Sequence, residues 1–386
     1  MSLEALNSPP LVGALTAGCY GLIPLVVKNP ILLNSAVVPF VAIKGINALA
    51  YGLSMYSVTR PGRYDGEASV TDNDYDGNND GDKKKKKNKN KAQPTTSKKN
   101  DASREGMKQM GTSTGRTLVP PSGWAFIIWA PIFIGELVMV TAPIIMSKGN
   151  GKYSVSPALQ QTIREITGPY FVAQLFQTLW AASFRAKYGS RGGIYKYISA
   201  LNLAGIAVSL SFCHDAFTKT IATASRSSRT ASSYSSLEYW IYFLPLSLHF
   251  GWTTAAALVN LNGMFALKDN NNNGDNEAAT TKSVAVLGNL SVLAATMIGV
   301  GITWTRKAPV YGGVICWALT AVASGLKQRI AAASAAGSEN NKKKDDNDNN
   351  ATDVVVGIYG AKRQRILSLI GAAICASTAA AVVVTK

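Results

Sequence analysis

PPSGWAFIIWAPIFIGELVMV, residues 120–140, is apolar and long enough to cross the hydrocarbon core of a membrane as an α-helix. The prolines at its start suit a helix N-terminus, where the first N–H groups have no helical partner. Trp124 falls at the expected membrane interface, and Trp129 and Phe133 follow on one helix face. Glu136 lies near mid-membrane, where a carboxylate is costly unless it is paired, protonated or hydrated. The stretch therefore predicts a membrane helix that carries a candidate functional residue.

Similar apolar blocks recur along the chain and predict an all-α, multi-pass integral membrane protein with about eight or nine spans. The first block lacks the basic start of a signal peptide and the Arg-rich character of a transit peptide, so we interpret it as a membrane segment. The predicted spans are 10–27, 31–57, 121–147, 169–186, 194–213, 238–267, 284–304, 310–330 and 366–384.

The segments between the blocks are polar. Residues 58–118, 268–282 and 335–352 are rich in Asp, Asn, Lys, Ser and Gly and lack apolar periodicity, so we predict that they are disordered. The predicted organisation is N-terminal membrane segments at 1–57, the second a candidate first core helix, a disordered loop at 58–118, a membrane core with extra helices at 119–330, a disordered polar loop at 331–365 and a C-terminal membrane helix at 366–386.

The net charge of +17 does not predict binding to nucleic acid. Much of the basic excess lies in the 58–118 loop and at the ends of other loops, as the topology of a membrane protein requires. The more basic side is predicted to face the cytosol or its equivalent. The sequon at Asn350 falls on that side, so glycosylation there would contradict this topology.

The chain shows no catalytic motif. It has no Gly-rich phosphate loop, no Ser/His/Asp set at known spacing and no paired carboxylates within one span. Its four cysteines lie in or beside apolar blocks, and its two histidines cannot form a multi-His metal site. We therefore predict a protein that is not an enzyme and requires no cofactor.

Two further polar residues lie within predicted spans. Lys44 is placed near the middle of the 31–57 span, and our hypothesis is that it pairs with Glu136 across the bundle. The alternative is that Glu136 stays protonated and hydrogen-bonds a neighbour. His249 is interpreted as a packing residue, because a lone membrane histidine is more often hydrogen-bonded than a ligand.

Aromatic residues repeat with polar ones in two other spans. Gln174 and Gln177 lie one turn apart, and Trp180 and Phe184 follow at the same spacing. Trp252, Ala256 and Asn260 form a stripe at spacing four in a later span. Such stripes either fill a helix bundle or line a ligand pocket, and the residues alone favour packing.

Taken in order, these motifs resemble the longer members of the TspO/MBR family, the tryptophan-rich sensory proteins related to the translocator protein. Their second core helix is similar to PPSGWAFIIWAPIF, although the family usually has Tyr where this chain has Phe133. Gln177 stands where the family has Asn. The other matching residues are Pro121, Gly123, Trp124, Phe126, Trp129, Trp180, Phe184, Pro245, Ser247, Gly251, Trp252, Ala256, Asn260, Trp317 and Ala318.

The resemblance covers roughly 31–330 and implies a five-helix core with additional transmembrane helices here. It implies a flat hydrophobic ligand, such as a tetrapyrrole, a sterol or a similar lipid, bound in an aromatic pocket for transport or sensing. A porphyrin or heme is a candidate ligand, and the bilayer and a second copy in a homodimer are candidate partners. The predicted pocket residues are Trp129, Phe133, Gln177, Trp180, Trp252 and Asn260.

Two rival functions remain open at this stage. In one, the protein is a membrane scaffold or assembly factor whose aromatic residues serve only packing. In the other, it is an intramembrane porphyrin-modifying enzyme that uses Glu136 and His249. The host membrane is predicted to be mitochondrial, plastid or endoplasmic reticulum.

Overall fold

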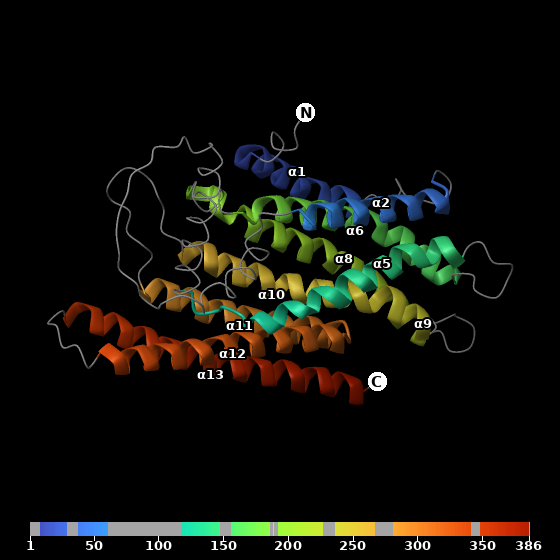
Figure 1. The fold of residues 1–386 in the computed structure, drawn as a ribbon. Helices are drawn as coiled ribbons and strands as arrows, with labels where there is room; N and C mark the ends of the chain where they lie inside the picture. Colours follow the sequence, from blue (N-terminus) through green and yellow to red (C-terminus); the bar gives the residue numbers. More distant parts are fainter. Residues whose placement is uncertain are drawn as a thin grey trace, which may run out of the picture.

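The computed structural model describes residues 8–28, 38–60, 117–146, 156–185, 188, 192–226, 236–266, 281–340 and 348–385. Within these ranges all regular structure is helical, and the long helices run roughly along one axis (Figure 1). The elements are α1 (Pro9–Lys28), α2 (Phe40–Val58), the 3-10 helix η3 (Gly123–Ile128), α5 (Trp129–Met146), α6 (Pro157–Ser183), the 3-10 helix η4 (Gly193–Tyr197), α8 (Ile198–Arg226), α9 (Ser236–Glu238), the π-helix η5 (Tyr239–Phe243), α10 (Leu244–Ala266), α11 (Thr281–Thr305), α12 (Pro309–Asn340) and α13 (Asp348–Val384).

The predicted all-α membrane fold is confirmed. Among the described residues, six helical stretches are long and apolar enough to cross a membrane. They are Pro9–Val27, Gly123–Ile145, Gly193–Thr220, Ser283–Thr305, Pro309–Ala331 and Gly360–Val384. The other long helices, α2, α6 and α10, carry more polar side chains, and several of these face the interior of the bundle.

The helices form two groups joined by a central pair. On one side α1, α2, α6 and α8 pack together, and on the other α11, α12 and α13 do so (Figure 1). Between them α10 contacts α8, α11 and α12, and α5 contacts both α2 and α10. Because α5 and α10 lie between the two groups, polar residues on their facing sides are shielded from lipid.

Several predicted boundaries differ from the structure. Helix α6 begins at Pro157, well before the predicted start at 169, and α8 continues to Arg226, past the predicted end at 213. Helix α2 begins at Phe40, with extended Pro39 at its N-cap, and residues 31–37 of the predicted second span lie outside the described residues. The polar loop predicted at 331–365 is mostly helical, since α12 continues to Asn340 and α13 begins at Asp348. Alanine-rich sequence after residue 330 favours this helical extension. The loops predicted at 58–118 and 268–282 lie mostly outside the described residues.

The opening stretch at 120–140 is held against α12 before it becomes an α-helix. The Ser122 N–H donates to the Ala321 carbonyl at 2.9 Å, and the Trp317 indole donates to the Ala125 carbonyl at 3.2 Å. Trp124 stays 41% exposed and packs edge-on against Trp317, with ring centroids 4.6 Å apart. The segment therefore starts as the short 3-10 helix η3, and α5 follows from Trp129.

Candidate functional site

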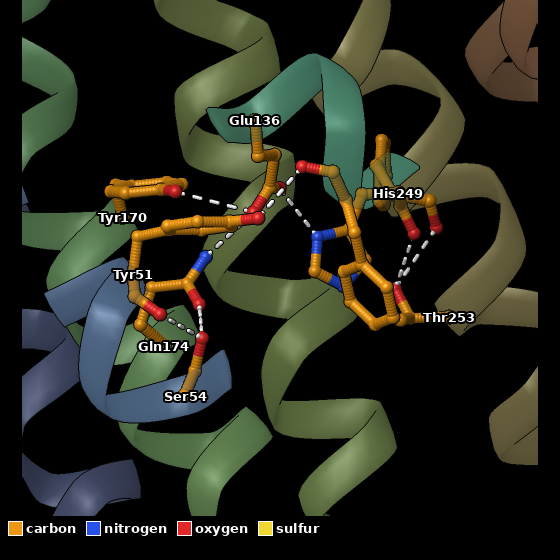
Figure 2. Close-up of polar contacts among 9 residues, drawn as sticks. Tyr51, Ser54, Glu136, Tyr170, Gln174, His249 and Thr253 are labelled. Carbon is orange, nitrogen blue, oxygen red and sulfur yellow. Dashed lines mark hydrogen bonds and ion pairs between the residues drawn. The ribbon is translucent and has the colours of Figure 1, made fainter. Parts of the chain in front are cut away.

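A buried polar network surrounds Glu136 in the middle of the bundle (Figure 2). Its carboxylate is 1% exposed and contacts side chains from two other helices. On α10, His249 Nδ1 lies 2.6 Å from Glu136 Oε1. On α6, Gln174 and Tyr170 donate to Glu136 Oε2 at 2.9 and 3.2 Å. Both carboxylate oxygens are thus partnered, which offsets the cost of removing the group from water.

Helix α2 adds an outer layer to this network that the sequence analysis did not anticipate. Ser54 donates to the Gln174 carbonyl oxygen at 2.5 Å and so orients the amide whose nitrogen faces Glu136. Tyr51 donates to the Phe133 backbone carbonyl at 2.7 Å. These two residues tie α2 to α5 and α6. Their helical spacing, three residues apart, is the signal in the sequence that could have indicated a shared inward face.

A close approach of α5 and α10 brings Glu136 to His249. A Cβ atom added at Gly135 would lie 2.7 Å from Pro245 Cγ, so the absence of a side chain permits the contact. His249 follows Pro245 by one helical turn, and Glu136 is the next residue after Gly135. The glycine thus sets the spacing at which the carboxylate and the imidazole meet.

The predicted pairing of Lys44 with Glu136 is wrong. Lys44 Nζ donates to the Pro143 backbone carbonyl at 2.7 Å and lies over the Phe40 ring. Since α5 ends at Met146, Pro143 is one of the last four residues whose carbonyls lack helical partners. Lys44 therefore caps the C-terminus of α5. The error came from the helix boundary, because Lys44 lies just after the start of α2 and not at its middle.

We predict that Lys44→Met and Glu136→Gln have additive effects on stability. Loss of the α5 cap should cost about 1 kcal/mol, while the two side chains share no partner. The measurement is the free energy of unfolding in detergent for both single variants and the double variant. A coupling energy well above roughly 0.5 kcal/mol would contradict the assigned partners.

Aromatic rings from α5 and α6 form a nearly parallel column beside the Glu136 network. Trp129 stacks on Phe133 with centroids 5.0 Å apart and planes at 14°. Trp129 also stacks on Trp180, with ring centroids 5.7 Å apart and planes at 25°. Trp180 in turn stacks on Phe184, with centroids 5.6 Å apart and planes at 20°. We call these four residues the aromatic column. It joins the start of α5 to the end of α6.

Trp129 also connects the aromatic column to α10. Its ring meets Trp252 nearly edge-on at 6.2 Å and His249 at 5.8 Å and 73°. Four of the six predicted pocket residues, Trp129, Phe133, Trp180 and Trp252, are therefore in one contiguous cluster.

The two predicted amide residues differ in their surroundings. Gln177 is completely buried one turn before Trp180, and neither its oxygen nor its nitrogen has a hydrogen-bond partner among the described residues. The Asn260 carbonyl oxygen instead accepts a hydrogen bond from Ser199 at 2.7 Å and links α10 to α8. Gln177 has free hydrogen-bonding capacity beside the column, whereas this oxygen of Asn260 is engaged in helix packing.

Comparison with known proteins identifies the family. A family model described as TSPO-like protein matches residues 97–338, more than half of the chain. The chain belongs to the TSPO-like family. No curated protein and no solved structure matches it.

The matched residues show which helices form the TSPO-like part of the chain. It includes α5 to α11 and most of α12, whereas α1, α2 and α13 lie outside it. The candidate first core helix at 31–57 lies outside the matched residues, so its place in the core stays a prediction. Glu136, His249 and the whole aromatic column lie in the TSPO-like part, while Tyr51 and Ser54 support it from outside.

Proposed function

We propose that this TSPO-like membrane protein binds a planar, largely apolar ligand of the tetrapyrrole class at the aromatic column and Trp252. The observation that carries the proposal is the near-parallel stacking of Trp129, Phe133, Trp180 and Phe184. Conjugated rings favour offset stacking on other conjugated rings, and each such pair contributes about 0.5–1.5 kcal/mol beyond the burial of area. A column of this kind suits a flat conjugated ligand better than the aliphatic rings of a sterol.

Buried polar atoms without partners supply the means to orient such a ligand. Within the described residues these include Trp252 Nε1, both amide atoms of Gln177 and His249 Nε2. Buried polar groups are normally hydrogen-bonded, so a concentration of unpartnered ones indicates missing partners. Ligand pockets commonly combine apolar walls with a few polar groups of this sort. Transport and sensing, the roles implied by the family resemblance, both begin with this binding step.

Ligand titration tests the proposal on the purified full chain in detergent micelles. Metal-free protoporphyrin should quench tryptophan fluorescence saturably. Trp129→Leu should weaken the affinity by about 2- to 10-fold, because it removes stacking on one ring face. Trp304→Leu is the matched control, since Trp304 lies on α11, is 51% exposed and has its ring by Lys307.

The outcomes separate the rival functions. Absence of saturable quenching would overturn the proposal in favour of a scaffold whose aromatic residues only pack. Consumption of the porphyrin that is abolished in Glu136→Gln would indicate an enzyme instead. An equal loss of affinity in both tryptophan variants would place the ligand outside the column.

A further inference from the structure

A partly open apolar crevice lies between α10, α11 and α12. Val119 and residues from these three helices line it, among them Leu258, Val292 and Val322. Every lining side chain is apolar except that of Ser291. None of the lining residues belongs to the aromatic column or to the Glu136 network, so the crevice is a separate candidate site.

Ser291 supplies a hydrogen-bond donor in this apolar wall. Asn262 on α10 donates to Ser291 Oγ at 2.7 Å, so the serine oxygen acts as the acceptor in that contact. The Ser291 O–H itself meets no acceptor among the described residues and is free to donate. A ligand in the crevice would therefore meet a hydroxyl that a neighbouring helix holds in place.

Basic side chains collect beyond the crevice, where α12 and α13 lie side by side (Figure 1). Close approaches of Gly312 to Ala379 and of Gly371 to Leu319 show that the two helices run antiparallel. Counting eight residues on from the second contact brings Lys327 level with Arg363. We call the group at this level the basic end, and it consists of Lys327, Arg329, Lys362, Arg363 and Arg365.

No acidic residue within the neighbouring spans balances the basic end. The stretches Ser283–Thr305, Pro309–Ala331 and Gly360–Val384 contain no Asp or Glu. Lys362 and Arg363 are exposed. Because like charges at close range repel one another, an anion placed among these side chains is stabilised.

Arg329 connects the basic end to the crevice. It follows Val322 by seven residues, or about two helical turns, and so lies on the same face of α12. Its Nη1 donates to the Thr117 carbonyl at 2.6 Å, two residues before Val119 in the crevice wall. The guanidinium is thus held directly above the crevice.

The depth of Ser291 can be placed relative to the same segment. A Cβ atom added at Gly288 would lie 3.2 Å from Leu118 Cβ, so these two residues are at one level. Ser291 follows Gly288 by three residues and lies about 5 Å deeper along α11. Cations, a hydroxyl donor and an apolar wall therefore succeed one another from the end of the bundle inward.

We propose that the basic end and the crevice together bind an anionic phospholipid. Its phosphate contacts Arg329 and the cations of α13, an ester carbonyl accepts from the Ser291 hydroxyl, and an acyl chain fills the crevice. In a bilayer the apolar wall alone gives little preference, because all lipid chains are about as apolar as the wall. The charge therefore selects the lipid, since each basic residue near the membrane surface favours an anionic headgroup by about 5-fold.

The experiment titrates the purified full chain in detergent micelles with dioleoyl phosphatidylglycerol or dioleoyl phosphatidylcholine, and native mass spectrometry measures the bound lipid. The wild type should bind the anionic lipid more tightly by about 5-fold or more. The double variant Lys362→Gln/Arg363→Gln should lose about 5-fold or more of that affinity and bind phosphatidylcholine as before. Lys307→Gln is the matched control, because Lys307 is an exposed cation beyond the opposite end of α11.

Two further variants test the crevice itself. Ala318→Leu fills it and should weaken the binding of both lipids by about 5-fold or more. Ser291→Ala should weaken the binding of dioleoyl phosphatidylglycerol by about 2- to 10-fold. A diether phosphatidylglycerol has no ester carbonyl, so its binding should not change in Ser291→Ala.

The contrary outcomes are distinct. Equal affinity of the wild type for the two lipids, or a preference that persists in Lys362→Gln/Arg363→Gln, would overturn the proposal. Anionic-lipid binding that is unchanged in Ala318→Leu would overturn it as well, because the chain would then lie outside the crevice. Displacement of the lipid by inorganic phosphate at equal concentration would identify a free anion as the ligand instead.

Discussion

His249→Leu is expected to lower the free energy of unfolding by about 3–5 kcal/mol. The substitution removes the partner of Glu136 Oε1 and leaves a carboxylate that is 1% exposed without its closest contact, at 2.6 Å. Removing the closest partner of a buried carboxylate costs more than the contact itself contributes, because the remaining group stays desolvated without that partner. Gln174 and Tyr170 still donate to Oε2, but Oε1 loses the contact with His249.

The accompanying variant Glu136→Gln identifies the cause of this loss. Glu136→Gln alone should cost less, and the double variant Glu136→Gln/His249→Leu should be more stable than His249→Leu, since no charge is then left buried without a partner. The measurement is unfolding in detergent, monitored by circular dichroism, for all three variants. His214→Leu serves as the control for replacing a buried imidazole. Strict additivity of the two substitutions would contradict the charge-based explanation.

The sequence predicted the helices well because each span is encoded locally. Length and apolar content were enough to anticipate α5, α11, α12 and the other long helices, since a membrane crossing needs about 20 apolar residues. The 3.6-residue period also placed Trp129 with Phe133, and Trp180 with Phe184, on common faces. Order of motifs along the chain then sufficed to indicate the TSPO-like family.

Contacts between helices were harder to predict from the sequence, because the helical period does not show which faces of two helices pack together. Glu136 was identified as a group in need of a partner, yet the choice of Lys44 depended on a depth that shifted when α2 began at Phe40. The actual partner, His249, lies far along the chain and is brought close by the contact of Gly135 with Pro245. In a single sequence, nothing indicates that a glycine in one span packs against a proline in another.

The same limit applied to the candidate pocket. Trp252 and Asn260 share one helical stripe, but the Asn260 carbonyl oxygen is engaged by Ser199 while Trp252 meets Trp129. One stripe thus supplies both a packing contact and a ring next to the column. Whether an amide is satisfied depends on the neighbouring helix, so the unpartnered state of Gln177 could be seen only in the folded structure.

Gly325→Ala is expected to destabilise the protein at the upper end of the roughly 1–3 kcal/mol that overpacking usually costs. A Cβ atom there would lie 2.4 Å from the Pro120 carbonyl oxygen and 3.2 Å from the Ser122 nitrogen. These are backbone atoms, so no rotamer change can relieve the clash, and the 120–122 segment must move away from α12. Such a shift would stretch the 2.9 Å hydrogen bond from Ser122 to the Ala321 carbonyl.

Gly313→Ala on the same helix is the matched control. A Cβ atom at Gly313 meets nothing within 4 Å, so this variant should be neutral or gain up to about 1 kcal/mol from the higher helix propensity of alanine. The two substitutions are chemically identical, yet only Gly325→Ala should lower the unfolding midpoint in detergent. Because Trp124 packs on Trp317 across the same contact, Gly325→Ala should also shift the tryptophan emission, whereas Gly313→Ala should not. Equal stability of the two variants would show that residues 120–122 do not lie against α12 in the folded protein, and the packing of the opening stretch described above would then be incorrect.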